Sequence, residues 1–204
     1  MNAEAGSSSC AFPGAESYIY VIGADGGIPR RLETDPPGGS WPYWSRDGRS
    51  IYFVTEGGGG SQIYLADVTG GKAIQVTQDP DKPDLPRESH DGRFLYYSKG
   101  YPFSQSVWRV PVDGGEGTKL FDGVDKYGSW TVRRDGIYFF TVPDVKGRRD
   151  LSIYEFATGR TRTILTVIGK LEFFGLEISP DGQTILYARE DESGSDLMLV
   201  ENFR

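Results

Sequence analysis

The chain alternates apolar and polar residues in short runs that are separated by glycine-rich breaks. Four such runs, rich in Ile, Val, Tyr and Phe, cover residues 41–45, 50–55, 62–68 and 73–77. Alternation over about four to eight residues favours a β-strand, because successive side chains of a strand point to opposite faces. Asp47-Gly48 and Thr69-Gly70-Gly71 stand between runs, where tight turns need residues that tolerate a positive φ. The stretch 41–77 is therefore predicted to be a four-stranded antiparallel meander.

This meander recurs along the chain at a nearly constant spacing. An Asp-Gly pair returns with its aspartates 44, 44 and 46 residues apart, at Asp47, Asp91, Asp135 and Asp181. The turn before the last strand returns with glycines 44, 44 and 45 residues apart, at Gly26, Gly70, Gly114 and Gly159. A pair of apolar or aromatic residues opens the third strand of each copy: Ile19-Tyr20, Ile63-Tyr64, Val107-Trp108, Ile153-Tyr154 and Leu197-Met198. Repeats of about 40–45 residues with four strands each are typical of β-propeller blades.

The repeats predict an all-β fold, an incomplete β-propeller of about four to five four-stranded antiparallel blades. The predicted parts are a disordered segment over residues 1–16, a half blade over 17–35, blades over 36–79, 80–123 and 124–169, and a partial blade over 170–204. Because the first repeat begins at its third strand, we expect the sequence to be a fragment whose upstream blades are missing.

The repeat motifs resemble those of TolB-type propellers, relatives of the WD-repeat proteins. The resemblance rests on Ser179-Pro180-Asp181-Gly182 with Ile185-Leu186-Tyr187, and on Ile19-Tyr20-Val21 followed by Asp25-Gly26-Gly27 and Leu32. The second half is similar to the C-terminal sensor propeller of bacterial winged-helix transcriptional regulators, in Ser129-Trp130-Thr131-Val132, Gly136-Ile137-Tyr138-Phe139, Phe156-Ala157-Thr158-Gly159-Arg160 and the stretch 194–203. This resemblance implies a sensing or interaction module, and a periplasmic one if its parent protein is anchored in a membrane.

Composition and charge narrow the classes of partner. The 204 residues are 37% hydrophobic and 13% aromatic, which suits a globular, strand-rich chain. A net charge of -7 argues against binding to nucleic acid or an anionic membrane, since both need concentrated Lys and Arg. The first sixteen residues lack the apolar core of a signal peptide, and no later run approaches the roughly 18 apolar residues of a membrane span.

Residues for catalysis or metal binding are sparse. His90 is the only histidine and Cys10 the only cysteine, which excludes the usual zinc ligand sets and an internal disulfide. No Gly-x-Ser-x-Gly nucleophile elbow occurs, so a Ser-His-Asp hydrolase is not expected within this chain. The acidic loop 190–196 lacks EF-hand ligand spacing, and the glycines of 57–60 have no following Lys-Ser/Thr. We expect no enzyme activity, no cofactor and no metal.

Binding is expected at the loops opposite the tight turns. The turns repeat with little variation, whereas the loops 56–61, 100–103, 143–150 and 190–195 diverge, and diverse loops on a repetitive scaffold usually carry binding. Six binding residues are predicted in these loops and in the connections between blades: Trp41, Asp84, Tyr101, Phe103, Tyr127 and Phe173. The alternative is that aromatic residues wedge adjacent blades together, above all Trp44 and Trp130. Self-association through open propeller edges is also predicted.

Two positions depart from the repeat. Glu88 stands where the other copies have Trp44, Val132 and Ile178, so it either pairs with a neighbour such as Arg87 or His90, or its blade is locally loose. Asp135-Gly136 lacks the two residues that follow the other Asp-Gly pairs, so its turn must differ.

The sequence as a whole favours a non-catalytic binding or sensor module, with a protein or a small ligand as partner, from a larger bacterial regulator or envelope protein. The alternative is the gating propeller of a prolyl-oligopeptidase-type serine peptidase whose catalytic domain lies outside the chain.

Overall fold

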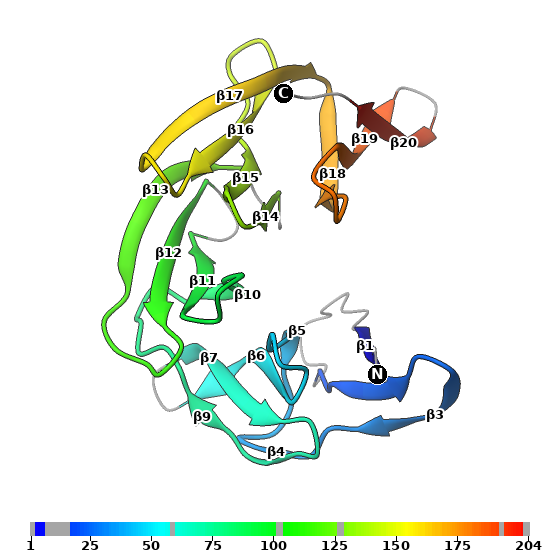
Figure 1. Cartoon of the computed structure of the whole chain (residues 1–204), viewed down its shortest axis with the longest axis vertical. Coiled ribbons are helices and arrows are strands. Elements are labelled where there is room, and N and C mark those ends of the chain that lie inside the picture. The colour runs from blue at the N-terminus through cyan, green and yellow to red at the C-terminus, as the bar shows by residue number, and fades with distance from the viewer. Residues whose placement is uncertain are drawn as a thin grey trace. The chain divides into compact units, whose positions relative to one another are not determined.

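A computed structural model of the chain describes residues 3–6, 17–57, 60–100, 104–125, 129–191 and 194–201, and the side chains of these residues except 3–6, 56, 57, 170, 172–175 and 190–201. Every helix or strand in these ranges is a β-strand (Figure 1). The chain divides into two compact units, Met1–Lys99 with Val107–Leu120, and Gly100–Ser106 with Phe121–Arg204.

The first unit contains two sheets and most of a third. The strands β1 (Ala3–Gly6), β2 (Tyr20–Gly23) and β3 (Gly26–Arg31) form a sheet in that order. The second sheet has the order β5 (Ser40–Trp44), β6 (Ser50–Gly57), β7 (Gly60–Asp67) and β9 (Ile74–Gln75), and β4 (Thr34–Asp35) pairs in parallel with β8 (Gly71–Lys72) beside it. The third sheet has the order β10 (Asp84–Glu88), β11 (Phe94–Lys99), β12 (Gln105–Pro111) and β13 (Thr118–Val124), and the boundary between the units crosses it.

The second unit contains two further sheets. One has the order β14 (Trp130–Val132), β15 (Gly136–Phe140), β16 (Arg148–Glu155) and β17 (Arg160–Ile168). The other has the order β18 (Lys170–Ile178), β19 (Thr184–Asp191) and β20 (Gly194–Glu201). Within the five sheets the neighbouring strands follow one another along the chain, except that β9 rather than β8 lies beside β7. The expected fold class of four-stranded antiparallel meanders in an incomplete propeller is confirmed.

Two details of the strands differ from the sequence prediction. Residues 3–6, inside the segment expected to be disordered, form β1, which pairs antiparallel with β2. The run 73–77, expected to be one strand, carries only β9, and the preceding Gly71 and Lys72 pair with β4 instead of with β7. Hydrophobic alternation indicates which residues of a strand share a face, but not which strand lies beside it. Neither pairing could therefore be predicted from it.

Each central sheet is buried on both faces because the strand period sends alternate residues to opposite sides. Along β6, Ile51 and Phe53 join a cluster with residues of the first sheet, whereas Tyr52 and Val54 join a cluster with residues of the third sheet. In the second unit, Tyr138 and Phe140 pack with residues of the last sheet in the same way: Leu171, Leu176, Ile178, Ile185 and Tyr187. The cores therefore lie between successive sheets.

The Asp-Gly turns are built by a serine that precedes the aspartate by two residues. Ser45 donates from Oγ to Asp47 Oδ1 at 2.7 Å and accepts the Ser50 N–H at 2.9 Å. The same bonds recur from Ser89 to Asp91 and Phe94, and from Ser179 to Asp181 and Thr184.

The shortened turn lacks this serine, and its carboxylate finds another donor. Asp135 Oδ2 accepts the Tyr138 hydroxyl at 2.9 Å, and Arg133 N–H donates to the Gly136 carbonyl at 2.9 Å. The turn therefore differs from the others, as the two missing residues predict.

Candidate interaction face

We call the first strand of each sheet that begins a meander, such as β5 and β10, its inner strand. The inner strands of the second and third sheets bulge where they begin. In β5 the register jumps between Ser40 and Tyr43, and in β10 between Asp84 and Arg87. Trp41 and Leu85, which stand 44 residues apart in the bulges, have φ values of 54° and 50°. Left-handed backbone in a bulky residue costs about 1–3 kcal/mol and persists only when the surrounding structure imposes it.

A proline follows each of these strained residues. Pro42 and Pro86 have no N–H, so neither can continue the ladder of hydrogen bonds to the neighbouring strand. A bulge at this point re-aims the strand and the side chains at its start. The Trp-Pro and Leu-Pro pairs were the sequence signal for the bulges, and the strand prediction did not use it.

The structure describes the side chains of two of the six predicted binding residues. Trp41 is half-buried and contacts the core cluster between the second and third sheets. Asp84 is half-buried and accepts a hydrogen bond from the hydroxyl of Ser98, a fully buried residue of β11. Tyr101, Phe103 and Tyr127 lie outside the described residues, and Phe173 lies in β18 with its side chain outside them.

The two described residues occupy matching ends of adjacent inner strands, since Ser40 pairs with Val54 as Asp84 pairs with Ser98. Sequence reasoning missed Ser98. The sequence feature that could have identified Ser98 is its polarity, because the same repeat position in the second sheet holds the apolar Val54.

The inner strands continue from the bulges with polar and aromatic side chains. The Arg87 guanidinium lies 4.8 Å from the centre of the Tyr43 ring, within range of a cation–π interaction. In the second unit, Thr131 and Glu177 occupy the repeat position that Tyr43 and Arg87 hold in the first. There Thr131 Oγ1 donates to Glu177 Oε2 at 3.4 Å.

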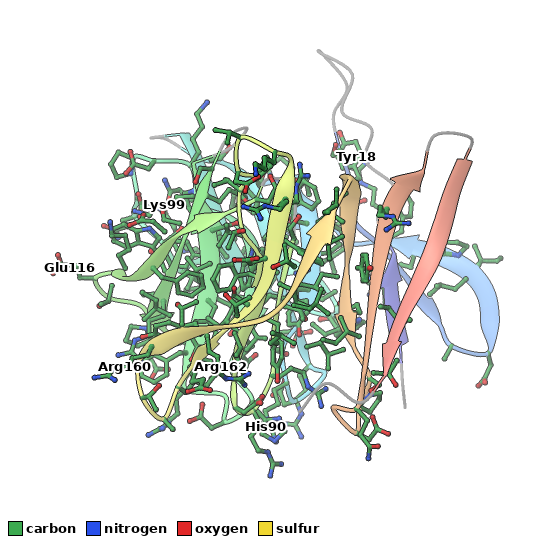
Figure 2. All side chains as sticks on the ribbon, turned by 90° about the horizontal axis from the view of Figure 1, so that it is seen from above. Tyr18, His90, Lys99, Glu116, Arg160 and Arg162 are labelled. Carbon is green, nitrogen blue, oxygen red and sulfur yellow. The ribbon has the colours of Figure 1, made fainter. Side chains whose placement is uncertain are left out.

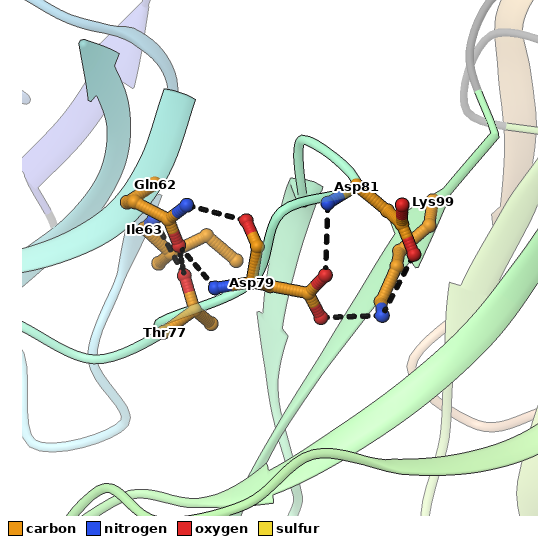
Figure 3. Close-up of polar contacts among 6 residues, drawn as sticks. All are labelled: Gln62, Ile63, Thr77, Asp79, Asp81 and Lys99. Carbon is orange, nitrogen blue, oxygen red and sulfur yellow. Dashed lines mark hydrogen bonds and ion pairs between the residues drawn. The ribbon is translucent and has the colours of Figure 1, made fainter. Parts of the chain in front are cut away.

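The connection between the second and third sheets is anchored by a buried ion pair (Figure 3). Lys99 Nζ pairs with Asp79 Oδ2, and their side chains are 8% and 11% exposed. The ammonium also lies 3.5 Å from the centre of the Trp108 ring and 3.8 Å from Asp81 Oδ2. Burial, and secondarily the charge and hydrogen bond of Asp79, raise the pKa of the Tyr97 hydroxyl.

Amide and hydroxyl groups fix the backbone at Asp79 and just before it. Gln62 accepts both the Thr77 hydroxyl and the Asp79 N–H at 2.9 Å, and its Nε2 donates to the Asp79 carbonyl at 2.5 Å (Figure 3). Thr77 Oγ1 in turn accepts the Ile63 N–H at 2.9 Å. The connection that leads to Asp84 is therefore fixed at its first residues, 77–79, by hydrogen bonds to Gln62 and by the ion pair with Lys99.

A second buried pair anchors the corresponding connection in the other unit. Arg149 donates from Nε to Asp125 Oδ2 at 2.6 Å and from Nη1 to the Gly169 carbonyl at 2.7 Å. Asp125 stands 44 residues after Asp81, the more distant of the two aspartates beside Lys99. Each connection thus places an aspartate beside a cation of the sheet that follows. Neither pair was predicted, because the cations stand at different repeat positions.

Glu88 is paired across to the neighbouring sheet. Its Oε2 accepts the Arg46 N–H at 2.9 Å, and burial together with this carboxylate raises the pKa of the Tyr52 hydroxyl. The sequence named Arg87 and His90 as candidate partners, and the contacts of Glu88 with Arg46 and Tyr52 add two from the preceding repeat. His90 is exposed at the turn end of the first unit, opposite Lys99 (Figure 2).

In the ranges that the structure describes, polar side chains such as Ser89 and Gln62 hydrogen-bond to the backbone of other residues. Within these ranges, no group of three or more His, Cys, Asp or Glu side chains could hold a metal ion. The part of the chain that the structure describes also contains no helix of the length and apolarity that a membrane crossing requires. Ser89, which precedes His90 in the chain, uses its hydroxyl within the turn, where it donates to Asp91 and accepts the Phe94 N–H.

No protein-family model and no curated protein sequence matches the chain. Solved structures do match. TolB from Acinetobacter baumannii superposes with a TM-score of 0.68 at 17% identity, over 90% of this chain and 46% of that one. A putative TolB from Agrobacterium tumefaciens gives 0.66 at 20% identity, over 92% of this chain and 71% of that one.

Propellers of other proteins match as well. The β-propeller domain of the Trilobed protease from Pyrococcus furiosus gives a TM-score of 0.59 at 16% identity, over 92% of this chain and 62% of that one. The chain thus spans about half the length of the Acinetobacter protein, and these identities establish the fold alone. The fold of the chain is that of a TolB-like β-propeller.

Proposed function

We propose that the chain is a non-catalytic binding or sensor module that takes a protein or small-ligand partner at the loop ends of its inner strands. As its sequence resemblance implies, it would serve within a larger bacterial regulator or envelope protein. The observation that carries the proposal is the pair of matching bulges at Trp41 and Leu85. The strain recurs at equivalent positions, once at the predicted binding residue Trp41 and once next to Asp84, and binding sites retain strain of this kind.

The side chains at these bulges favour a ligand with both apolar and basic groups. Trp41 offers a half-buried aromatic surface, and Asp84 offers a half-buried carboxylate that is oriented by Ser98. Asp81, whose side chain is 71% exposed, adds a second negative charge to the same connection. An extended peptide with an apolar residue near a Lys or Arg has this chemistry.

A selection from a random linear peptide library on the purified chain tests the proposal. Enriched peptides should carry a basic residue beside an apolar one, and Trp41→Ser or Asp84→Asn should weaken their binding by about tenfold or more. Arg49→Ala, in a turn at the other end of the same sheet, is the control and should leave binding unchanged. Peptides that bind all variants equally, or an absence of enriched peptides, would contradict the proposal.

The gating propeller of a serine peptidase is the second candidate. It is favoured by the match to an acylaminoacyl peptidase, with a TM-score of 0.60 at 15% identity over 91% of this chain and 34% of that one. In that case the coding sequence beside this chain would encode an α/β-hydrolase, whereas a winged-helix domain there would support the sensor.

A further inference from the structure

Two consecutive residues at the end of β11 hold the connection that leads from the second sheet to the third. Ser98 donates a hydrogen bond to the carboxylate of Asp84, at the end of the connection. Lys99 forms its ion pair with Asp79, near the start of the connection. One strand end therefore ties down this segment at two points.

The carboxylate of Asp79 passes the hold of Lys99 on to Asp81 (Figure 3). Its Oδ2 pairs with the ammonium of Lys99, while its Oδ1 accepts the Asp81 N–H at 3.0 Å. The Tyr97 hydroxyl hydrogen-bonds to the same carboxylate. The backbone position of Asp81, whose side chain is 71% exposed, therefore depends on a buried carboxylate that Lys99 and Tyr97 orient.

Lys99 itself is shielded from a partner molecule. Its side chain is 8% exposed, and its ammonium lies against the Trp108 ring and beside Asp79 and Asp81. Any effect of Lys99 on binding must therefore pass through the residues that it holds.

Local preference does not give the connection its shape. Lys82 and Leu85 both have a φ of 50°, and Pro83 and Pro86 follow them directly. A residue before proline prefers extended backbone, and left-handed backbone is uncommon outside glycine. Such a conformation persists only where the surrounding structure imposes it. The bonds from β11 lie on either side of Lys82 along the chain and can supply that constraint.

We infer that Lys99 is a positioning residue for the binding site proposed at Asp84, an inference that rests on the proposed function. Acting through Asp79, Lys99 fixes Asp81, while Ser98 fixes Asp84. The two acidic residues thereby stay in a set arrangement for the basic group of a peptide. A site arranged in advance loses less conformational freedom when it binds, so release of the connection weakens recognition of that basic group.

The double variant Lys99→Met with Asp79→Ala tests the hold on the free chain. It removes one charge of each sign, so the net charge of -7 is unchanged and any effect comes from the lost tie. Order parameters from ¹⁵N relaxation of the Asp81, Lys82 and Asp84 amides should fall from about 0.85, the value of rigid backbone, to below about 0.6.

The second readout is the selectivity for a basic group. The probes are a peptide from the library selection and the same peptide with norleucine in place of lysine, or citrulline in place of arginine. The unmodified chain should prefer the basic peptide by about tenfold or more, and the double variant by less than about threefold. A purely stabilising role for Lys99 would lower the folded fraction, weaken both peptides equally and leave this ratio unchanged.

Two further variants complete the test. Leu151→Ala opens a cavity in the core of the second unit, so it destabilises the chain without touching the connection and should change neither readout. Tyr97→Phe removes only the hydroxyl on Asp79, so it repeats the test, with smaller changes in the same direction, in a chain that keeps its ion pair. Circular dichroism checks the fold of each variant.

Order parameters that stay at the unmodified values in both connection variants would overturn the inference, and so would an unchanged selectivity ratio. An unmodified chain that binds the basic and the neutral peptide equally would instead contradict the proposed function. The order parameters of the free chain separate the two failures, because they report the hold of Lys99 without any peptide.

Discussion

The two ends of the second and third sheets are built in opposite ways. At the turn end, Ser45 with Asp47 and Ser89 with Asp91 form the same hydrogen-bonded turn twice, with side chains that satisfy one another locally. At the other end, Trp41 and Leu85 are held in left-handed backbone, and the connection between the sheets depends on the buried pair of Lys99 and Asp79. Under the proposed function, the strained end is the one that binds a partner.

The largest expected effect comes from breaking the buried pair at the strained end. Lys99→Met or Asp79→Asn should each lower the free energy of unfolding by about 3–5 kcal/mol, because each leaves a buried polar or charged partner uncompensated. The double variant should be more stable than the sum of the two losses predicts. Urea denaturation followed by tryptophan fluorescence measures all three, and strictly additive losses would show that the pair is not coupled.

A smaller effect is expected at the turn end. Ser89→Ala removes a hydroxyl that accepts the Phe94 N–H at 3.0 Å and donates to Asp91, and should lower the free energy of unfolding by about 1–3 kcal/mol. Arg134→Ala is the matched control, since Arg134 is exposed in the turn that lacks the serine, and it should cost less than about 0.5 kcal/mol. Equal losses in thermal melts of the two variants would contradict the account of the turns.

The smallest effect is a change in ionisation at the same turn. Hydrogen bonds from Ser89 first, and then from Arg93, lower the pKa of Asp91 from 3.8 to about 2. Because the folded-state value lies below the unfolded one, the stabilisation is fully present above pH 3.8 and is lost as the pH falls toward 2. Ser89→Ala should raise this pKa toward 3.8, which carboxyl carbon NMR during a pH titration detects; an unchanged value would show that Ser89 does not set it.

The difference between the two ends also explains how far the sequence could be interpreted. The turns recur in sequence because their bonds join residues at most five apart, so Asp-Gly spacing was sufficient to predict the meanders and the all-β class. The strained end depends on pairs separate in sequence, such as Asp125 with Arg149, whose members follow no common repeat position. Trp41 and Asp84 were found only because they stand where the inner strands begin, while Ser98 and Lys99 stood inside a predicted strand without a periodic signal.

The most direct test of binding at the strained end is amide chemical-shift mapping with a peptide from the library selection. The account predicts that the perturbed amides gather at residues 40–43, 82–87 and 98–99, where β5 and β10 begin and β11 ends. Perturbations that gather instead at the turns of residues 45–49 and 89–93 would contradict it.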